Sequence, residues 1–262
     1  MVKEDEQIDL VEHLEELRTR IIRGVLYVVL GFVAGWVFYP QIYAMLMAPL
    51  LNPVLRAGGH IRLGMITEGL MTRFQVSAVA GIIIALPGVL YEIWGFVSPG
   101  MTRDERRAAA PLLPSAIGLF AAGVAVGYFI TPRFVTWMLS PAFVPKGTVI
   151  LLELQRQITL VAKMLLAFGL CFQLPIVLTF LIKAGVISTD FLAARRKEAV
   201  IGILVIAAIV TPTWDVFMLA VLAVPMFALY EGTIWYARIA ERRERAAARL
   251  AAQADDSDSH PR

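Results

Sequence analysis

The chain has 262 residues, of which 58% are apolar and only 17% are charged, and its mean hydropathy is +0.71. Water would not keep a monomer of this composition in solution, so a water-soluble globular protein is excluded. The formal net charge of +3 is less informative, because in a membrane protein the side that holds the cations sets the orientation. The composition therefore predicts a protein that crosses a bilayer several times.

The segment that precedes the first long apolar stretch is polar and rich in acidic residues. Its apolar side chains recur at helical spacing and form one stripe: Leu10, Leu14, Leu17 and Ile21. Glu12, Glu16 and Arg20 share another face, which predicts an (i, i+4) ion pair on a solvated or interfacial helix. A cleavable signal peptide would instead begin with a basic region and a short apolar one. We therefore expect the first membrane span to act as its own insertion signal.

Six apolar stretches follow, and each is a candidate membrane span because a crossing takes about 20 mostly apolar residues. The expected spans cover residues 21–38, 70–96, 110–138, 155–184, 199–213 and 216–236. The fifth and sixth are short, so they either thin the bilayer locally or form a re-entrant hairpin. Prolines inside the spans predict bent helices that enclose a concave face. The expected fold is an all-α polytopic bundle with six transmembrane helices.

Most of the 24 basic residues fall in segments on the same side as the N-terminus. The positive-inside rule then places both termini, and the loop "SPGMTRDERR" between spans two and three, in the cytoplasm. Residues 1–240 are expected to form one transmembrane domain, with short helices on the outer surface between spans one and two. Residues 241–262 are expected to form a cytoplasmic tail that is flexible, first basic and then acidic.

Sequence motifs for enzyme chemistry are missing. The histidines His13, His60 and His260 lie in three unconnected segments, and the chain has no nucleotide-binding, zinc-hydrolase or serine-hydrolase motif. The single cysteine, Cys171, has no partner for a disulfide and is expected to be a small buried side chain. We expect a protein that is not an enzyme and that holds no metal and no cofactor, so its energy must come from elsewhere.

Carboxylates at the predicted cytoplasmic membrane face are the most unusual feature: Glu15, Glu16, Glu92, Asp104, Glu105 and Glu231. One interpretation is that the loop acids are simply neutralised by neighbouring arginines. The other is that two separated carboxylates form a receptor for a ligand with two guanidinium groups. A carboxylate can accept the planar fork of arginine in a bidentate manner, whereas lysine offers a point charge. Such a site would distinguish Arg-Arg from Lys-Lys.

Polar residues inside the predicted spans are few. The main ones are Gln75, Ser77, Gln173, Thr211 and Asp215. A glutamine in a span usually hydrogen-bonds to another helix of the same bundle at about 1 kcal/mol. Gln173 could equally dock a helix of a partner protein, and the sequence leaves these two interpretations open.

Several segments in the same order resemble the TatC family, the large subunit of the twin-arginine protein translocase. They are "HLEELRTRI", "APLL", "LPGVLYEIWGFVSPGMTRDERR", "FGLCFQLPIV" and "TPTWDVFMLAVLAVPMFALYE". The resemblance implies a receptor in the bacterial inner membrane that binds the Arg-Arg motif of signal peptides. It also implies export of folded cargo with the single-span subunits TatA and TatB, driven by the proton-motive force, and self-association in the receptor complex.

The resemblance also assigns expected roles to individual residues. It implies that Glu16 and Glu105 bind the paired arginines and that Arg18 organises the acidic patch. Partner helices are expected near Gln173 and Thr211, although the family often has glutamate at the position of Gln173. Structural or outer-side roles are implied for Pro49, Phe96 and Asp215.

The alternative is a secondary transporter or channel for a small solute. Such folds usually show two related halves and ionisable residues near mid-membrane depth. The chain shows no convincing repeat, and we identify no ionisable residue at mid-depth in its spans. These features favour the translocase receptor.

Overall fold

The structure is a computed structural model that describes residues 2–98, 111–145, 147–210 and 216–259. It is mostly helical, and the chain divides into two compact units. Unit 1 comprises Met1–Gln173 and Val210–Thr213, and unit 2 comprises Leu174–Ile209 and Trp214–Arg262. Each unit has its own helix packing, so the two are described in turn.

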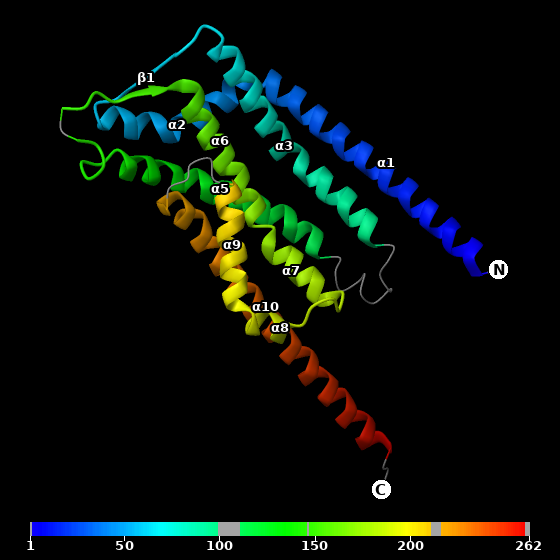
Figure 1. The fold of residues 1–262 in the computed structure, drawn as a ribbon. Helices are drawn as coiled ribbons and strands as arrows, with labels where there is room; N and C mark the ends of the chain where they lie inside the picture. The colour runs from blue at the N-terminus through cyan, green and yellow to red at the C-terminus, as the bar shows by residue number, and fades with distance from the viewer. Residues whose placement is uncertain (1, 99–110, 146, 211–215, 260–262) are drawn as a thin grey trace. The chain divides into compact units, whose positions relative to one another are not determined.

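Unit 1 is built from long apolar helices and two very short strands (Figure 1). Its elements are α1 (Val2–Val37), α2 (Tyr39–Arg56), β1 (His60–Arg62), α3 (Glu68–Val97), α5 (Leu112–Met138), β2 (Leu151–Glu153) and α6 (Leu154–Cys171). Helix α1 runs beside α3, α5 packs on α6, and α2 lies against α5. The strands β1 and β2 form what we call the strand end of the unit, where α3 begins at Glu68, and Glu92 lies near the other end of α3.

Helices α1 and α3 are in contact over most of their length because small residues line the surface between them. A Cβ atom added to Gly81 would lie 2.6 Å from the Phe32 nitrogen, and one added to Gly35 would lie 2.8 Å from the Ser77 carbonyl oxygen. Gly31 faces the backbone of Gly81 at still closer range. Close backbone approach at small residues is how membrane helices gain packing energy, since lipid supplies no hydrophobic drive between them.

A second close contact joins α5 and α6. A Cβ atom on Gly123 would lie 2.6 Å from the Phe168 carbonyl oxygen, and one on Gly169 would meet the Phe120 ring. Phe168 is almost fully buried, and Ile158 and Val161 on the same helix are completely buried. These residues make α5 and α6 a closely packed pair within unit 1.

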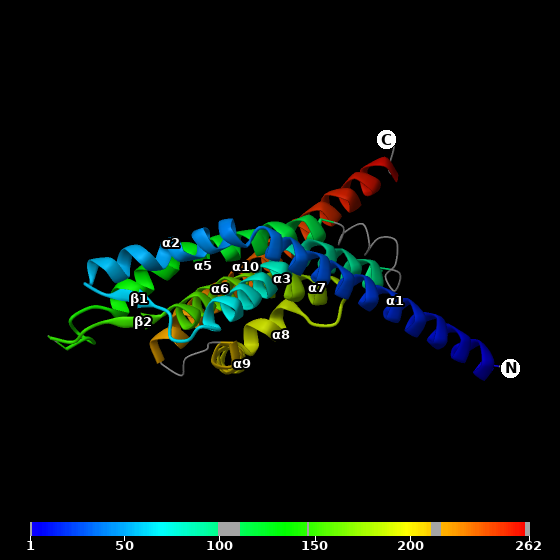
Figure 2. The same ribbon diagram turned by 90° about the horizontal axis from the view of Figure 1, so that it is seen from above.

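Two short strands accompany the helices, and the mostly helical fold agrees with the expected all-α class. Strands β1 and β2 pair in parallel, with Ile61 opposite Leu152, and lie side by side in Figure 2. They link the connection between α2 and α3 to the connection between α5 and α6. Three-residue strands carry too little alternation to be recognised from sequence.

Unit 2 contains α7 (Leu174–Lys183), α8 (Thr189–Ala194), α9 (Arg196–Val210) and α10 (Val216–Ser259). Helix α10 packs on α7 and on α8. The Tyr230 hydroxyl donates a hydrogen bond of 2.7 Å to the carbonyl oxygen of Leu192, which fixes α10 to the end of α8. Thr189 donates to Glu241 at 2.5 Å farther along α10.

The predicted spans agree with the helices in most places and differ in three. Five helical segments are long and apolar enough to cross a membrane, including Leu154–Lys183. The fifth predicted span is short as expected, with 15 residues in α9, but the sixth is not short, because the apolar segment Leu219–Arg243 of α10 has 25 residues. The fourth span is broken between α6 and α7, because Pro175 has no N–H group to donate to the Cys171 carbonyl and its ring crowds that carbonyl. Helix α10 continues to Ser259, where a flexible tail was expected, since alanine, arginine and glutamate favour helices. The count of six spans stays a prediction.

A bidentate ion pair joins α9 and α10. Arg196 Nε lies 2.5 Å from Glu231 Oε1, and Arg196 Nη2 lies 3.2 Å from Glu231 Oε2. Replacing Arg196 with lysine removes this fork, so we expect the free energy of unfolding to fall by about 1 kcal/mol. The neighbouring Arg195→Lys variant is the control, because its pair with Glu198 spans 3.7 Å and both side chains are exposed. Thermal unfolding that shifts equally in both variants would show that the fork adds nothing.

Candidate functional site

Glu16 is the predicted receptor carboxylate that the structure describes, and it already binds a guanidinium. Arg20 lies one helical turn later on α1, and its Nε and Nη2 donate to Glu16 Oε1 at 2.9 and 2.6 Å. The predicted (i, i+4) pair on this helix is therefore confirmed for Glu16 and Arg20. The Glu16 side chain remains 34% exposed, so part of this carboxylate is open to a ligand.

Arg20 also contacts a second carboxylate that comes from α3. Its Nη1 lies 3.2 Å from Glu92 Oε2, and the Tyr27 hydroxyl donates to Glu92 Oε1 at 3.3 Å. Glu92 is 5% exposed, far less than Glu16. A buried carboxylate is stable only when it is paired with a cation and hydrogen-bonded. Arg20 provides the cation, and Arg20 and Tyr27 provide the hydrogen bonds.

Two glycines of α3 create the space for this cluster. A Cβ atom on Gly95 would overlap Arg20 Nη1, and a Cβ atom on Gly88 would lie 2.9 Å from the Tyr27 ring. Glu92 stands between these glycines on α3. The same antiparallel contact that brings Gly31 onto Gly81 thus sets Arg20 and Tyr27 against α3. We call Glu16, Arg20, Tyr27 and Glu92 the Arg20 cluster.

A hollow of about 440 Å³ opens beside the Arg20 cluster. It is lined by α1 residues that include both members of the ion pair: Glu15, Glu16, Thr19, Arg20 and Arg23. Glu92 does not line the hollow, because it lies behind Arg20 on α3. A ligand that enters the hollow therefore meets Glu16 and Arg20 first.

The other predicted site residues fall in different places. Arg18 is exposed and makes no ion pair within the described residues, so in the structure Arg20 is the arginine that holds Glu16. Pro49 is buried in α2, and Phe96 lies in the last turn of α3 next to Gly95. Three more lie outside the described residues: Glu105, Thr211 and Asp215. The pairing of Glu16 with Glu105 therefore stays a prediction.

Gln173 lies at the break that follows α6. Its Nε2 donates a hydrogen bond of 3.0 Å to the Ala116 carbonyl oxygen on α5. Its Oε1 is buried and has no hydrogen-bond partner among the described residues. The contact with α5 supports the interpretation of Gln173 as a bond within the bundle, while docking of a partner helix stays a prediction.

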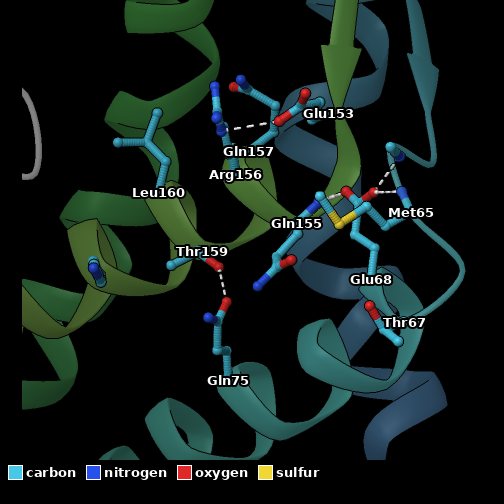
Figure 3. Close-up of a pocket in the computed structure, with 12 residues that line it drawn as sticks. Met65, Thr67, Glu68, Gln75, Glu153, Gln155, Arg156, Gln157, Thr159 and Leu160 are labelled. Carbon is cyan, nitrogen blue, oxygen red and sulfur yellow. Dashed lines mark hydrogen bonds and ion pairs between the residues drawn. The ribbon is translucent and has the colours of Figure 1, made fainter.

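The strand end of unit 1 holds a larger pocket of about 630 Å³ (Figure 3). Its most constrained side chain is Glu68, the first residue of α3. The Glu68 carboxylate accepts backbone N–H groups from Gln155 at 2.7 Å, from Met65 at 3.2 Å and from Gly64. On the facing wall Thr159 donates to Gln75, as the dashed line in Figure 3 shows. Glu68 thus ties the start of α3 to the start of α6.

Lys163 also lines this pocket and was not among the residues predicted from the sequence. It is exposed and lies within the apolar helical segment Leu154–Lys183, so that candidate span does carry an ionisable residue. The overlooked signal was the position of one lysine between two uncharged runs. Among the described residues, no group of three His, Cys, Asp or Glu side chains is arranged to hold a metal ion.

The profile of the family "Sec-independent protein translocase protein (TatC)" matches residues 12–225. The chain belongs to the TatC family. It is accordingly a multi-pass membrane protein of the twin-arginine translocase, a transport protein and not an enzyme. The segment matched contains the whole Arg20 cluster.

Relatives and solved structures agree with this family assignment. The TatC protein of Azotobacter chroococcum mcd 1 is 34% identical over 93% of this chain and 94% of its own length. That of Desulforapulum autotrophicum is 36% identical over 91% of this chain and 87% of its own. A crystal structure of the twin-arginine translocase receptor TatC in the detergent DDM matches with a TM-score of 0.76 and 34% identity. It covers 86% of this chain and 99% of the solved one.

Proposed function

We propose that this TatC protein is the signal-peptide receptor of a twin-arginine translocase and that Glu16 binds an arginine of the Arg-Arg motif. The observation that carries the proposal is the Glu16–Arg20 pair. Glu16 accepts two guanidinium N–H groups from its own chain, and its side chain, which is one third exposed, lines the hollow. A carboxylate with this exposure and geometry suits a second guanidinium from a peptide.

Glu105 is proposed as the other carboxylate of the site, on the strength of the family resemblance. One carboxylate for each arginine would make recognition of the pair depend on two charge-assisted bonds rather than one. Each such bond contributes about 1.5–3 kcal/mol, so loss of either carboxylate is enough to weaken binding strongly. Arg18 is proposed to act near the same surface.

The rest of the proposed function concerns partners and place. TatA and TatB subunits and further copies of this chain would assemble with it in the bacterial inner membrane, with both termini in the cytoplasm. Partner helices are proposed to dock near Gln173 and Thr211. The proton-motive force would supply the energy for the export of folded cargo.

The site is tested by the binding of a fluorescent peptide with an S-R-R-x-F-L-K motif to the purified protein in nanodiscs. We expect Glu16→Gln to weaken binding about 10- to 100-fold, which matches the loss of a charged hydrogen-bonded contact. Glu15→Gln is the matched control, because Glu15 lines the same hollow while the described ion pair on this helix joins Arg20 to Glu16. We expect it to change affinity about twofold at most.

Crosslinking gives the second readout of the same proposal. A photoreactive residue at position 16, and another at position 105, should capture the Arg-Arg peptide and capture its Lys-Lys counterpart poorly. Equal capture of both peptides, or unchanged affinity after Glu16→Gln, would remove Glu16 from the site.

A further inference from the structure

Arg20 is shared between two carboxylates that differ in their surroundings. It bonds Glu16 through Nε and Nη2 and Glu92 through Nη1, so all three of its nitrogens donate to protein oxygens. Glu16 lies at the wall of the hollow, whereas Glu92 is buried on α3. Arg20 itself is 21% exposed at its side chain and separates the hollow from Glu92.

The cost of losing Arg20 is different for these two carboxylates. Water in the hollow can solvate Glu16 if Arg20 leaves it, because the carboxylate is partly exposed already. Among the described residues, Glu92 would keep only the Tyr27 hydroxyl as a partner, and a buried charge paired this poorly is strongly unfavourable. Arg20 is therefore bound firmly at its inner contact and more loosely at its outer one.

The Arg20 cluster carries more negative than positive charge, which favours the binding of one more cation. Glu16 and Glu92 carry two negative charges and Arg20 carries one positive charge, so the group has an excess negative charge beside the hollow. Both bonds from Arg20 to Glu16 end on Oε1, whereas a peptide guanidinium that binds in a bidentate manner needs both oxygens of Glu16, so it competes with Arg20 for Oε1. Glu92 can retain Arg20 during this exchange, because Nη1 is already bonded to it.

We infer that the Arg20 guanidinium binds Glu16 in the free protein. When an arginine of the signal peptide binds Glu16, Arg20 leaves Glu16 and keeps its ion pair with Glu92. This inference rests on the proposed function of Glu16. It assigns Glu92 to the receptor site as the inner carboxylate that receives Arg20. Arg20 then competes with the peptide for Glu16, so the peptide binds more weakly than it would to a Glu16 that has no bond to Arg20.

The decisive variant is the double substitution Arg20→Gln with Glu92→Gln in the full-length protein. It removes one positive and one negative charge, so the net charge of the cluster is unchanged, and two amides can hydrogen-bond where the ion pair was. Glu16 then has no resident guanidinium. We expect the Arg-Arg peptide to bind about tenfold tighter than to the wild type, or about 1.4 kcal/mol.

The single variant Glu92→Gln should act in the opposite direction. Arg20 loses its inner acceptor and is held by Glu16 alone, so we expect peptide binding to weaken about tenfold. The affinity for the Lys-Lys peptide should change by the same factor in both variants, because Arg20 competes equally with every ligand of Glu16. The ratio of the affinities for the Arg-Arg and Lys-Lys peptides should therefore stay the same.

A third variant covers the case in which an amide pair at this depth prevents folding. Gly95→Ala alters no charge, but its Cβ atom takes the space of Arg20 Nη1, the end of a flexible side chain. This displaces Arg20 from Glu92, so peptide affinity should fall as it does for Glu92→Gln. Unchanged affinity in a folded Gly95→Ala protein would overturn the inference.

The outcomes separate this inference from the proposed function. If the double variant binds the Arg-Arg peptide more weakly than the wild type and loses its preference over Lys-Lys, Arg20 positions Glu16 and does not compete for it. That result overturns the inference and leaves Glu16 in the site. If Glu16→Gln binds like the wild type, the proposed site itself is wrong, whatever the double variant does.

Discussion

Gly81→Ala should separate α1 from α3 and lower the free energy of unfolding by about 1–3 kcal/mol. The added Cβ atom would lie 2.6 Å from the Phe32 nitrogen and 2.7 Å from its Cα atom, and backbone atoms cannot rotate away as a side chain can. The helices must therefore move apart along a contact that extends to Arg20. The unfolding midpoint of the purified protein in detergent measures the loss, and weaker peptide binding should accompany it.

Gly24→Ala is the matched control for this prediction. Gly24 lies in the middle of α1, and a Cβ atom there would meet nothing within 4 Å. Alanine is a better helix former than glycine by about 0.5–1 kcal/mol, so this variant should be as stable as the wild type or slightly more stable. If both substitutions shift the midpoint alike, helix propensity rather than close packing governs this contact.

Much of the helical framework follows from the sequence because long uncharged runs have few alternatives to membrane helices. The runs around Phe74 to Tyr91 and Ala108 to Pro132 predict α3 and the greater part of α5. Prolines inside the spans predicted bends, but neither the full break after Cys171 nor the pairing of β1 with β2 was predicted. The first depends on a single proline, and the second joins segments far apart in the chain, which no local pattern reveals.

The site shows the same division between local and distant contacts. The Glu16–Arg20 pair was predicted, because residues four apart face each other on a helix. The bond from Arg20 to Glu92 spans 72 positions and depends on the register between α1 and α3. The sequence signal for this contact was the pair Gly88 and Gly95, on either side of Glu92. Two glycines seven residues apart lie on the same face of a helix, where they leave space for bulky side chains of a neighbouring helix.

Glu68→Ala should loosen the strand end of unit 1 by about 3 kcal/mol. Glu68 is 5% exposed, and its carboxylate accepts the backbone N–H groups of Gly64, Met65 and Gln155. Alanine leaves the three donors without their acceptor. Water can replace the carboxylate at the exposed Gly64 and Met65, so the largest loss falls on the less exposed Gln155 N–H group. Hydrogen exchange read by mass spectrometry should become faster in the peptides that contain the three amides, while the α1–α3 contact at Gly81 keeps its protection.

Glu68→Gln is expected to recover only part of this loss, because the two carboxylate oxygens have different tasks. Oε1 accepts from Gln155, and Oε2 accepts from Gly64 and Met65. An amide offers one oxygen, so its NH2 group must face one set of donors. Glu153→Gln is the control in the same pocket, since its pair with the exposed Arg156 should contribute less than about 1 kcal/mol. Slow exchange at Gln155 in Glu68→Ala would show that β1 and β2 hold the strand end without this carboxylate.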